Sequence, residues 1–265
     1  MWIEFCLACV LTTLVLYVPG ALTLSASGMD RRRAIIRGPL VSVACYSILA
    51  IVFVLLGIRA SLVSLVLGHL ILFFLLLAWN HGFCRRVIRE GATDEGADWK
   101  SHIDHLLPLI YVLVGLATTC FFFVKNLDGA GSFFQAYDNG NHLNIVRSFL
   151  ETGQYSSFNA TFYPATTSGA VSPFIDASSF YPSAWHCIVA MIVGVVGEPI
   201  TLGVNAINTV LLAVVFPLSM YDFFAVLFKD DRRALLAGSA ICVAFTASVW
   251  TFVSFGPLYP MLLSY

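Results

Sequence analysis

The chain has 265 residues and a formal net charge of -1, and its composition is 59% hydrophobic and only 11% charged. The mean hydropathy of +0.86 lies outside the range of soluble domains, so the composition predicts an integral membrane protein. With almost no net charge and no extended basic stripe, the chain is not expected to bind nucleic acid.

The seven cysteines do not indicate a disulfide scaffold. Six lie within or at the ends of apolar segments and read as small hydrophobic residues, while the seventh, Cys84, stands beside an arginine pair. The CxxC spacing of Cys6 and Cys9 has no second cysteine pair and no nearby histidine, which disfavours a metal or redox role.

The first apolar run, from Trp2 to Leu24, could be a cleaved signal or a retained helix. A secretory signal needs a basic start, and the first six residues carry only Glu4 as a charged side chain. At about 1.5 Å per residue, the run is long enough to cross a hydrocarbon core of roughly 30 Å. We therefore expect a retained transmembrane helix.

Six further apolar segments follow, and the fold class expected is an all-α, polytopic transmembrane bundle of about seven spans. Each segment must be helical because lipid offers no partner to the backbone N–H and C=O groups. The segment at 184–197 is short, so a tilted, re-entrant or interfacial helix is the alternative there. The segments are 39–57, 60–80, 105–124, 184–197, 201–228 and 234–256.

Basic residues in short loops predict the orientation. Two clusters should be cytoplasmic: one at 31–37, and one formed by Arg85, Arg86, Arg89 and Lys100. The N-terminus and a long loop at 125–183 are then extracytoplasmic, which divides the chain into 1–124, 125–183 and 184–265. The basic segment 229–233 conflicts with this topology, since it would lie outside if 184–197 crossed the membrane.

The long loop contains a predicted amphipathic helix over 138–152. Apolar residues recur there at helical spacing, with Asp138 as a plausible N-cap and Gly153 as a plausible C′ residue. Asp138 and His142 are one turn apart and share a face. A capping role explains Asp138 without catalysis, and a surface position explains His142, so both interpretations stay open.

Aromatic residues are frequent in the second part of the loop. Flat rings among hydroxyls and amides suit sugar rings or a lipid head group, although an interfacial aromatic belt has the same composition. The run from Tyr181 through Trp185 and His186 leads into the next apolar segment and puts a second histidine at the outer boundary. We therefore expect Asp138, His142 and His186 to face one pocket.

Three motifs, at 137–142, 151–157 and 181–186, resemble a family of uncharacterised actinobacterial polytopic membrane proteins. That family is similar in layout to the GT-C membrane glycosyltransferases. The resemblance implies a multi-pass protein of a bacterial plasma membrane. It would transfer sugar from a polyprenyl-phosphate donor to a glycan acceptor on the outer face, with Asp138 as catalytic base. Two features depart from the pattern: Asn139 replaces a paired acid, and the chain stops at Tyr265, as expected of a truncated form.

Under this hypothesis, His142, Arg147 and His186 neutralise the leaving phosphate, and Tyr181 and Trp185 complete the substrate-binding set. The cofactor is undetermined. A divalent metal held by Asp138 and the two histidines is the weaker hypothesis, because only two of the three ligands have a supporting spacing.

Two other classes of function remain. A transporter subunit normally has ionisable residues within its spans, and the few here are His69, Glu198 and Asp222, of which only His69 is clearly deep. That scarcity argues against ion-coupled transport. A non-catalytic or truncated membrane scaffold is the third hypothesis.

Overall fold

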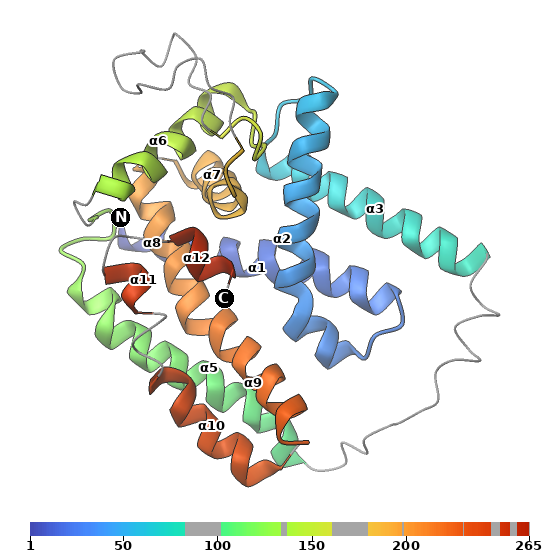
Figure 1. Ribbon diagram of the computed structural model, residues 1–265, viewed down its shortest axis with the longest axis vertical. Helices are drawn as coiled ribbons and strands as arrows, with labels where there is room; N and C mark the ends of the chain where they lie inside the picture. The colour runs from blue at the N-terminus through green and yellow to red at the C-terminus, as the bar shows by residue number, and fades with distance from the viewer. Residues whose placement is uncertain are drawn as a thin grey trace.

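The computed structural model describes residues 1–82, 102–133, 137–160, 180–197, 199–229, 231–244, 250–254 and 259–264. Every element in these ranges is helical, which confirms the all-α class (Figure 1). The predicted basic cluster at 85–100 with Cys84, the aromatic residues of 161–179, and Glu198 lie outside the described residues.

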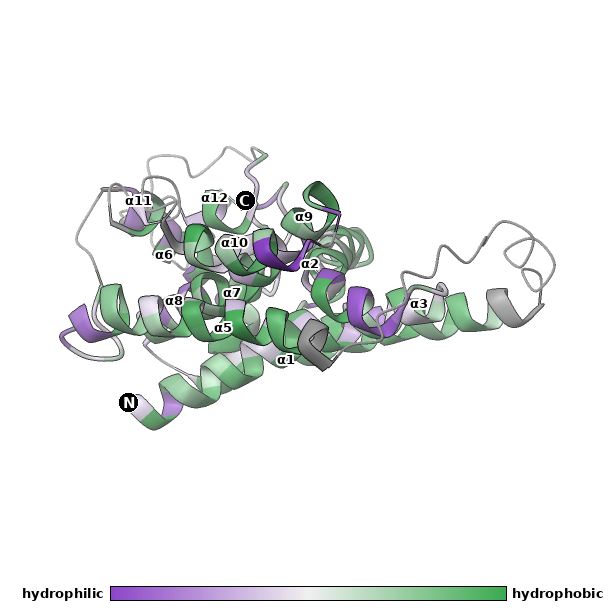
Figure 2. Cartoon of the chain, turned by 90° about the horizontal axis from the view of Figure 1, so that it is seen from below, coloured by the Kyte–Doolittle hydropathy of each residue, from purple (hydrophilic) through white to green (hydrophobic). Residues whose placement is uncertain are grey.

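Five helices in the described part of the chain are long and apolar enough to cross a membrane. The fifth is continuous, although a π-helical turn, η3 (Leu211–Val215), interrupts its regular winding. Figure 2 shows hydrophobic residues along most of α1, α3 and α5, as expected for surfaces that face lipid. The chain is thus a multi-pass membrane protein. The helices are α1 (Trp2–Ala26), α2 (Arg31–Leu55), α3 (Leu62–Gly82), α5 (His102–Phe122) and α8–η3–α9 (Ile200–Val210, Leu211–Val215, Phe216–Leu227).

The prediction of seven spans was too high for the described residues. The helix α7 (Ala184–Val196) has 13 residues, about 20 Å at 1.5 Å per residue, which is short of the roughly 30 Å core. It is seen nearly end-on in Figure 1, where α5 and α9 run across the picture. The predicted span 234–256 contains the short helices α10 (Arg232–Ala244) and α11 (Thr251–Ser254), with 245–249 outside the described residues.

Close contact between small residues joins α1 to α2. Gly20 packs directly on the carbonyl of Gly38, and its N–H donates to Ser42 Oγ at 2.9 Å. Tyr46 then donates its hydroxyl to the carbonyl of Val15 at 3.0 Å. Small residues let helix backbones approach, and in lipid such packing replaces the hydrophobic effect as the force that joins helices.

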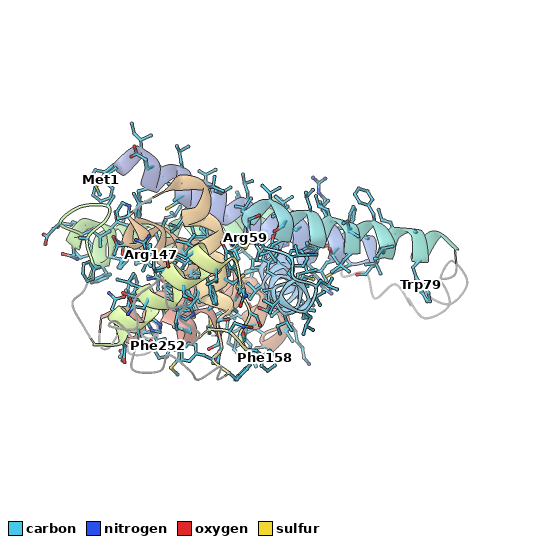
Figure 3. The ribbon with its side chains drawn as sticks, turned by 90° about the horizontal axis from the view of Figure 1, so that it is seen from above. Met1, Arg59, Trp79, Arg147, Phe158 and Phe252 are labelled. Carbon is cyan, nitrogen blue, oxygen red and sulfur yellow. The ribbon has the colours of Figure 1, made fainter. Side chains whose placement is uncertain are left out.

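We call one end of the bundle the loop end, defined by the turn 56–61, the loop 127–133 and α6 (Tyr137–Thr152). Arg59 donates to the carbonyl of Glu151 at 2.9 Å, and the N–H of Ala60 to the carbonyl of Gly153 at 2.8 Å. Met1 belongs to this end because its Cε lies 2.8 Å from the position a Cβ would take on Gly131. Figure 3 shows Met1 and Trp79, near the end of α3, on opposite sides of the molecule.

The opposite, basic end is defined by Arg31–Arg37 at the start of α2 and by Lys229 after α9. Arg37 and Asp222 form a two-point ion pair at 2.8 and 3.2 Å, which joins α2 to α9. Lys229 lines the same pocket as Arg32. Because α7 does not cross the bundle, Lys229 and the start of the helix that follows it, at Asp231 and Arg232, lie at the same end as the first basic cluster. The topological conflict therefore disappears.

The predicted amphipathic helix is α6, which packs on α7 and α8 across the loop end (Figure 1). Its buried face repeats at helical spacing through Asn139, His142, Val146 and Phe149. Gly153 ends it with a φ of +71°, and its N–H donates to the carbonyl of Phe149 at 2.8 Å, so the predicted C′ role is confirmed.

The cap prediction at the other end of α6 was wrong. The helix begins at Tyr137, which places Asp138 within the first turn and not before it. A carboxylate there still interacts favourably with the helix dipole.

Candidate functional site

Two buried histidines from different helices meet beneath α6. His142 Nδ1 lies 2.9 Å from His186 Nε2, and the two residues are 3% and 0% exposed. The rings of Tyr181, Trp185 and Tyr259 lie 5.0–5.9 Å from one or both imidazoles. These five residues form what we call the histidine–aromatic cluster.

The hydrogen bond between the imidazoles limits the charge of the pair. One ring must donate and the other must accept through an unprotonated nitrogen, so at least one ring is neutral. Burial, and next the neighbouring His142, lower the pKa of His186 well below its ordinary value. His186 Nδ1 is buried with no hydrogen-bond partner among the described residues. The pair therefore holds at most one proton beyond its neutral state.

Helix α8 anchors the cluster from below. Trp185 donates its indole N–H to Asn208 Oδ1 at 3.2 Å, and both residues are fully buried. Tyr259, at the start of α12 (Tyr259–Ser264), stacks on Trp185 with ring centroids 5.1 Å apart. A buried indole N–H needs such a partner, so Asn208 fixes the ring orientation.

Asp138 stands at the exposed edge of the cluster. Burial and then the negative charge of Asp138 raise the pKa of Tyr181, so the carboxylate lies within electrostatic range of that phenol. Tyr181 in turn meets His186 edge to face, with centroids 5.6 Å apart. Asp138, Tyr181 and the two histidines are thus close in the fold, although Asp138 and Tyr181 are 43 positions apart in the sequence.

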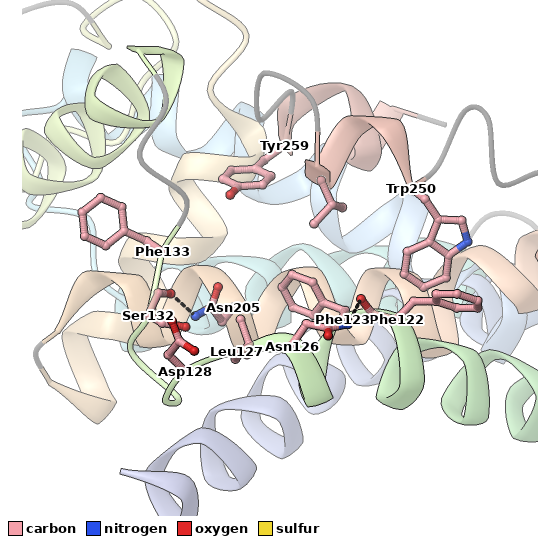
Figure 4. A pocket seen from close by; sticks show the side chains of 11 residues that line it. Phe122, Phe123, Asn126, Leu127, Asp128, Ser132, Phe133, Asn205, Trp250 and Tyr259 are labelled. Carbon is pink, nitrogen blue, oxygen red and sulfur yellow. Dashed lines mark hydrogen bonds between the residues drawn. The ribbon is translucent and has the colours of Figure 1, made fainter.

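A cavity with a volume of about 530 Å³ adjoins this cluster. Tyr259 belongs to both. Figure 4 shows aromatic rings around the space and polar side chains on one side of it. The aromatic lining is Phe122, Phe123, Phe133, Trp250 and Tyr259, and the polar lining is Asn126, Asp128, Ser132 and Asn205.

The polar groups of the cavity are mainly hydrogen-bond acceptors. Asn126 donates its side-chain amide to the carbonyl of Phe122 at 2.9 Å. Asn205 donates its side-chain amide to the carbonyls of Ala130 and Ser132 at 3.0 and 2.6 Å. Their amide oxygens and the Asp128 carboxylate can only accept. No cationic side chain is among the described lining residues. The cavity therefore suits a ligand rich in hydroxyl donors.

One protein family matches nearly the whole chain, the cluster and the cavity included. A family described as a family of unknown function (DUF6541) matches residues 13–265, which include the histidine–aromatic cluster and the cavity. The chain belongs to the DUF6541 family. No curated protein and no solved structure matches it.

In the folded DUF6541 chain, five of the six site residues proposed from the sequence lie close together. Asp138, His142, Tyr181, Trp185 and His186 are neighbours, whereas Arg147 lies on the exposed face of α6 and pairs with Glu151 at 4.0 Å. In the described residues, no group of three or more histidine, cysteine, aspartate or glutamate side chains could hold a metal ion.

Sequence reasoning missed the polar lining of the cavity. The available signal for Asp128 was the Asp128–Gly131 turn, which directly follows the fourth span and contains two glycines. Asn205 and Asn208 carried a second signal, since two amides three residues apart within an apolar helix share a face.

Proposed function

We propose that this DUF6541 protein is a membrane-embedded glycosyltransferase that takes a sugar from a polyprenyl-phosphate donor at the loop end. The orientation rule predicts that this end faces the outside. The observation that supports the proposal best is the cavity, because its acceptor groups match sugar hydroxyls and its rings offer flat apolar faces to the C–H groups of a pyranose.

The donor phosphate would stay at the mouth of the cavity. An anion is disfavoured inside, where Asp128 is the charged group among the described lining residues. Lys125, exposed next to the lining residue Asn126, has its Nζ 5.0 Å from the Phe121 ring centroid. We assign phosphate neutralisation to Lys125 in place of Arg147, which is turned away on α6.

In the proposed reaction, the two aspartates have different tasks. Asp128 accepts hydrogen bonds from donor hydroxyls in the cavity, and Asp138 takes the proton of the acceptor hydroxyl. As that oxygen bonds to the anomeric carbon, the bond from this carbon to the phosphate oxygen breaks. The bonding electrons leave with the lipid phosphate, whose negative charge Lys125 balances.

The test uses the full chain reconstituted in liposomes with a panel of polyprenyl-phosphate hexoses and pentoses and cell-envelope glycan acceptors. We expect Asp138→Asn to lower kcat by about 10²–10⁴, the range for a general base, while Asp128→Asn mainly raises KM. Glu151→Gln removes an exposed acid from the same helix and serves as the control with normal turnover. Full activity of Asp138→Asn would refute the base assignment, and no transfer from any donor of the panel would refute the proposed reaction.

The ionisable residues relevant to transport do not favour that alternative. His69 is buried between α1 and α3, where its Nε2 lies 3.0 Å from Thr23 Oγ1. Asp222 is paired with Arg37 at the basic end. These two residues occupy separate places in the bundle, and neither lines the 530 Å³ cavity.

A further inference from the structure

A second pocket, at the basic end, combines strong positive charge with an apolar wall. Its volume is about 220 Å³, below the roughly 300–1,000 Å³ of pockets that hold drug-sized ligands. Four cationic side chains and one carboxylate line it, a formal net charge of +3: Arg32, Arg33, Arg37, Lys229 and Asp222. A charge of this density favours a small anion.

The start of α2 is built to present these arginines. Asp30 caps the helix by accepting from the N–H groups of Arg32 and Arg33 at 3.0 and 3.3 Å, which fixes the first turn. The positive end of the helix dipole adds to the side-chain charge there. One turn on, the two-point contact of Arg37 with Asp222 sets the distance between α2 and α9.

Lys229 enters the pocket from an unusual backbone conformation. Its φ of +51° makes it the one residue other than glycine with a positive φ in the described part of the chain. This position just after α9 is where glycine is normally preferred, because a Cβ is disfavoured in the left-handed region. A lysine there adds a cation to the pocket at a cost in backbone energy.

An apolar groove continues from this pocket along the helices. It has a volume of about 250 Å³ and shares Ile36, Arg37 and Asp222 with the basic pocket. Its walls come from α2, from the η3–α9 junction, from α12 and, through Leu16, from α1. The C-terminal end of α12 lies near α2 and α9 in Figure 1. Leu40, on the α2 wall, is 74% exposed, so the groove opens toward the surroundings of the bundle.

We propose that the two cavities together bind one anionic phospholipid of the bilayer, with its phosphate among the arginines and Lys229 and one acyl chain in the groove. The continuity of charged pocket and apolar groove matches the head and tail of a lipid. Free phosphate shares the head-group chemistry but would leave the groove empty. The site is separate from the proposed glycosyltransferase site, and it lies at the end of the bundle predicted to be cytoplasmic, where anionic lipid attracts basic residues.

The experiment measures lipid binding to the full chain in mixed non-ionic micelles by native mass spectrometry and by the shift in Tm. The probes are phosphatidylglycerol, phosphatidylcholine with the same acyl chains, and glycerol phosphate. We expect phosphatidylglycerol to bind more tightly than phosphatidylcholine by at least tenfold, and glycerol phosphate to give no shift at the same concentration. Equal binding of the two lipids, or equal binding of glycerol phosphate, would overturn the proposal.

Two variants separate the pocket from general surface charge. Lys229→Gly removes one cation and puts a glycine at the positive φ, so the Tm of the lipid-free protein should not fall. The affinity for phosphatidylglycerol should fall about fivefold, the effect of one basic residue near a membrane surface. Arg31→Gln removes a cation that does not line the pocket and should change affinity less than twofold. Equal losses in the two variants would show that the attraction is diffuse and refute the site.

Discussion

The hydrogen bond between His142 and His186 leads to a prediction about stability. Replacing either ring by phenylalanine keeps a similar shape but leaves the other ring with a buried nitrogen that has lost its partner. Both residues are at most 3% exposed, so water cannot restore the bond. Each single variant should lose about 1–3 kcal/mol, the cost of an unsatisfied buried group. The double variant removes both polar groups and should lose less than the sum of the two single losses.

The same pair should make stability depend on pH. His186 is a base whose pKa in the folded protein is lowered, by burial and then by His142, from its ordinary 6.5. The unfolded chain therefore binds more protons just below that value, and stability must rise with pH there. The stability that comes from keeping His186 neutral is fully present above a pH of about 6.5. It is lost as the pH falls, by at most about 1.4 kcal/mol per pH unit for one proton.

The assay is thermal unfolding of the purified chain in detergent at one scan rate, from pH 5 to 8, for the parent protein and the three variants. One kcal/mol corresponds to about 2–4 °C in Tm for a chain of this size. The decline below pH 6.5 should be smaller in His186→Phe. Additive losses in the double variant, or an unchanged pH profile in His186→Phe, would refute the coupling inferred from the 2.9 Å contact.

Three glycine substitutions test the helix packing and the end of α6. Gly20→Ala places a methyl group against the carbonyl of Gly38 and 2.8 Å from Ser42 Oγ, so α1 and α2 must move apart. The variant should lose about 1–3 kcal/mol of folding stability, measured as a lower Tm. Gly153→Ala forces a Cβ onto a residue with a φ of +71° just after α6 and should lower stability by about 1 kcal/mol or more. Gly140→Ala, within α6 and facing open space, should raise stability by up to about 1 kcal/mol. A Gly153→Ala variant as stable as the parent would contradict the described end of α6.

The extent of sequence-based prediction is clearest at α6. Helical periodicity identified the helix and its buried apolar residues, and the glycine that ends it was recognised as well, because these depend on residues within one or two turns. It did not show that Asn139, His142 and Ser148 are also buried. The start was misjudged by two residues, since the helix begins at Tyr137 and a cap at Asp138 would have begun it at Asn139. Hydropathy likewise identified all five long helices, because a hydrocarbon core imposes its length on each span independently.

The short helix α7 shows where such reasoning ends. Its hydropathy resembles that of a span, yet nine consecutive residues from Trp185 to Val193 are buried by other helices. Lipid and protein interior are both apolar, so composition does not distinguish them. Whether α7 spans the membrane decides at which end of the bundle Lys229 lies. The ion pair between Arg37 and Asp222 places the end of α9 beside the start of α2, and so gives the answer.

By itself, the sequence determined that this is a membrane protein, where most of its helices run, and that Asp138, His142 and His186 were worth joining in one hypothesis. Only the tertiary structure decided that the two imidazoles bond to each other, that Asn208 holds Trp185, and that a cavity with Asp128 adjoins them. The physical reason is range. Periodicity and hydropathy act between neighbours along the chain. The two hydrogen bonds join residues 44 and 23 positions apart, and the cavity brings Phe122 together with Tyr259, so these features exist only once the helices have packed.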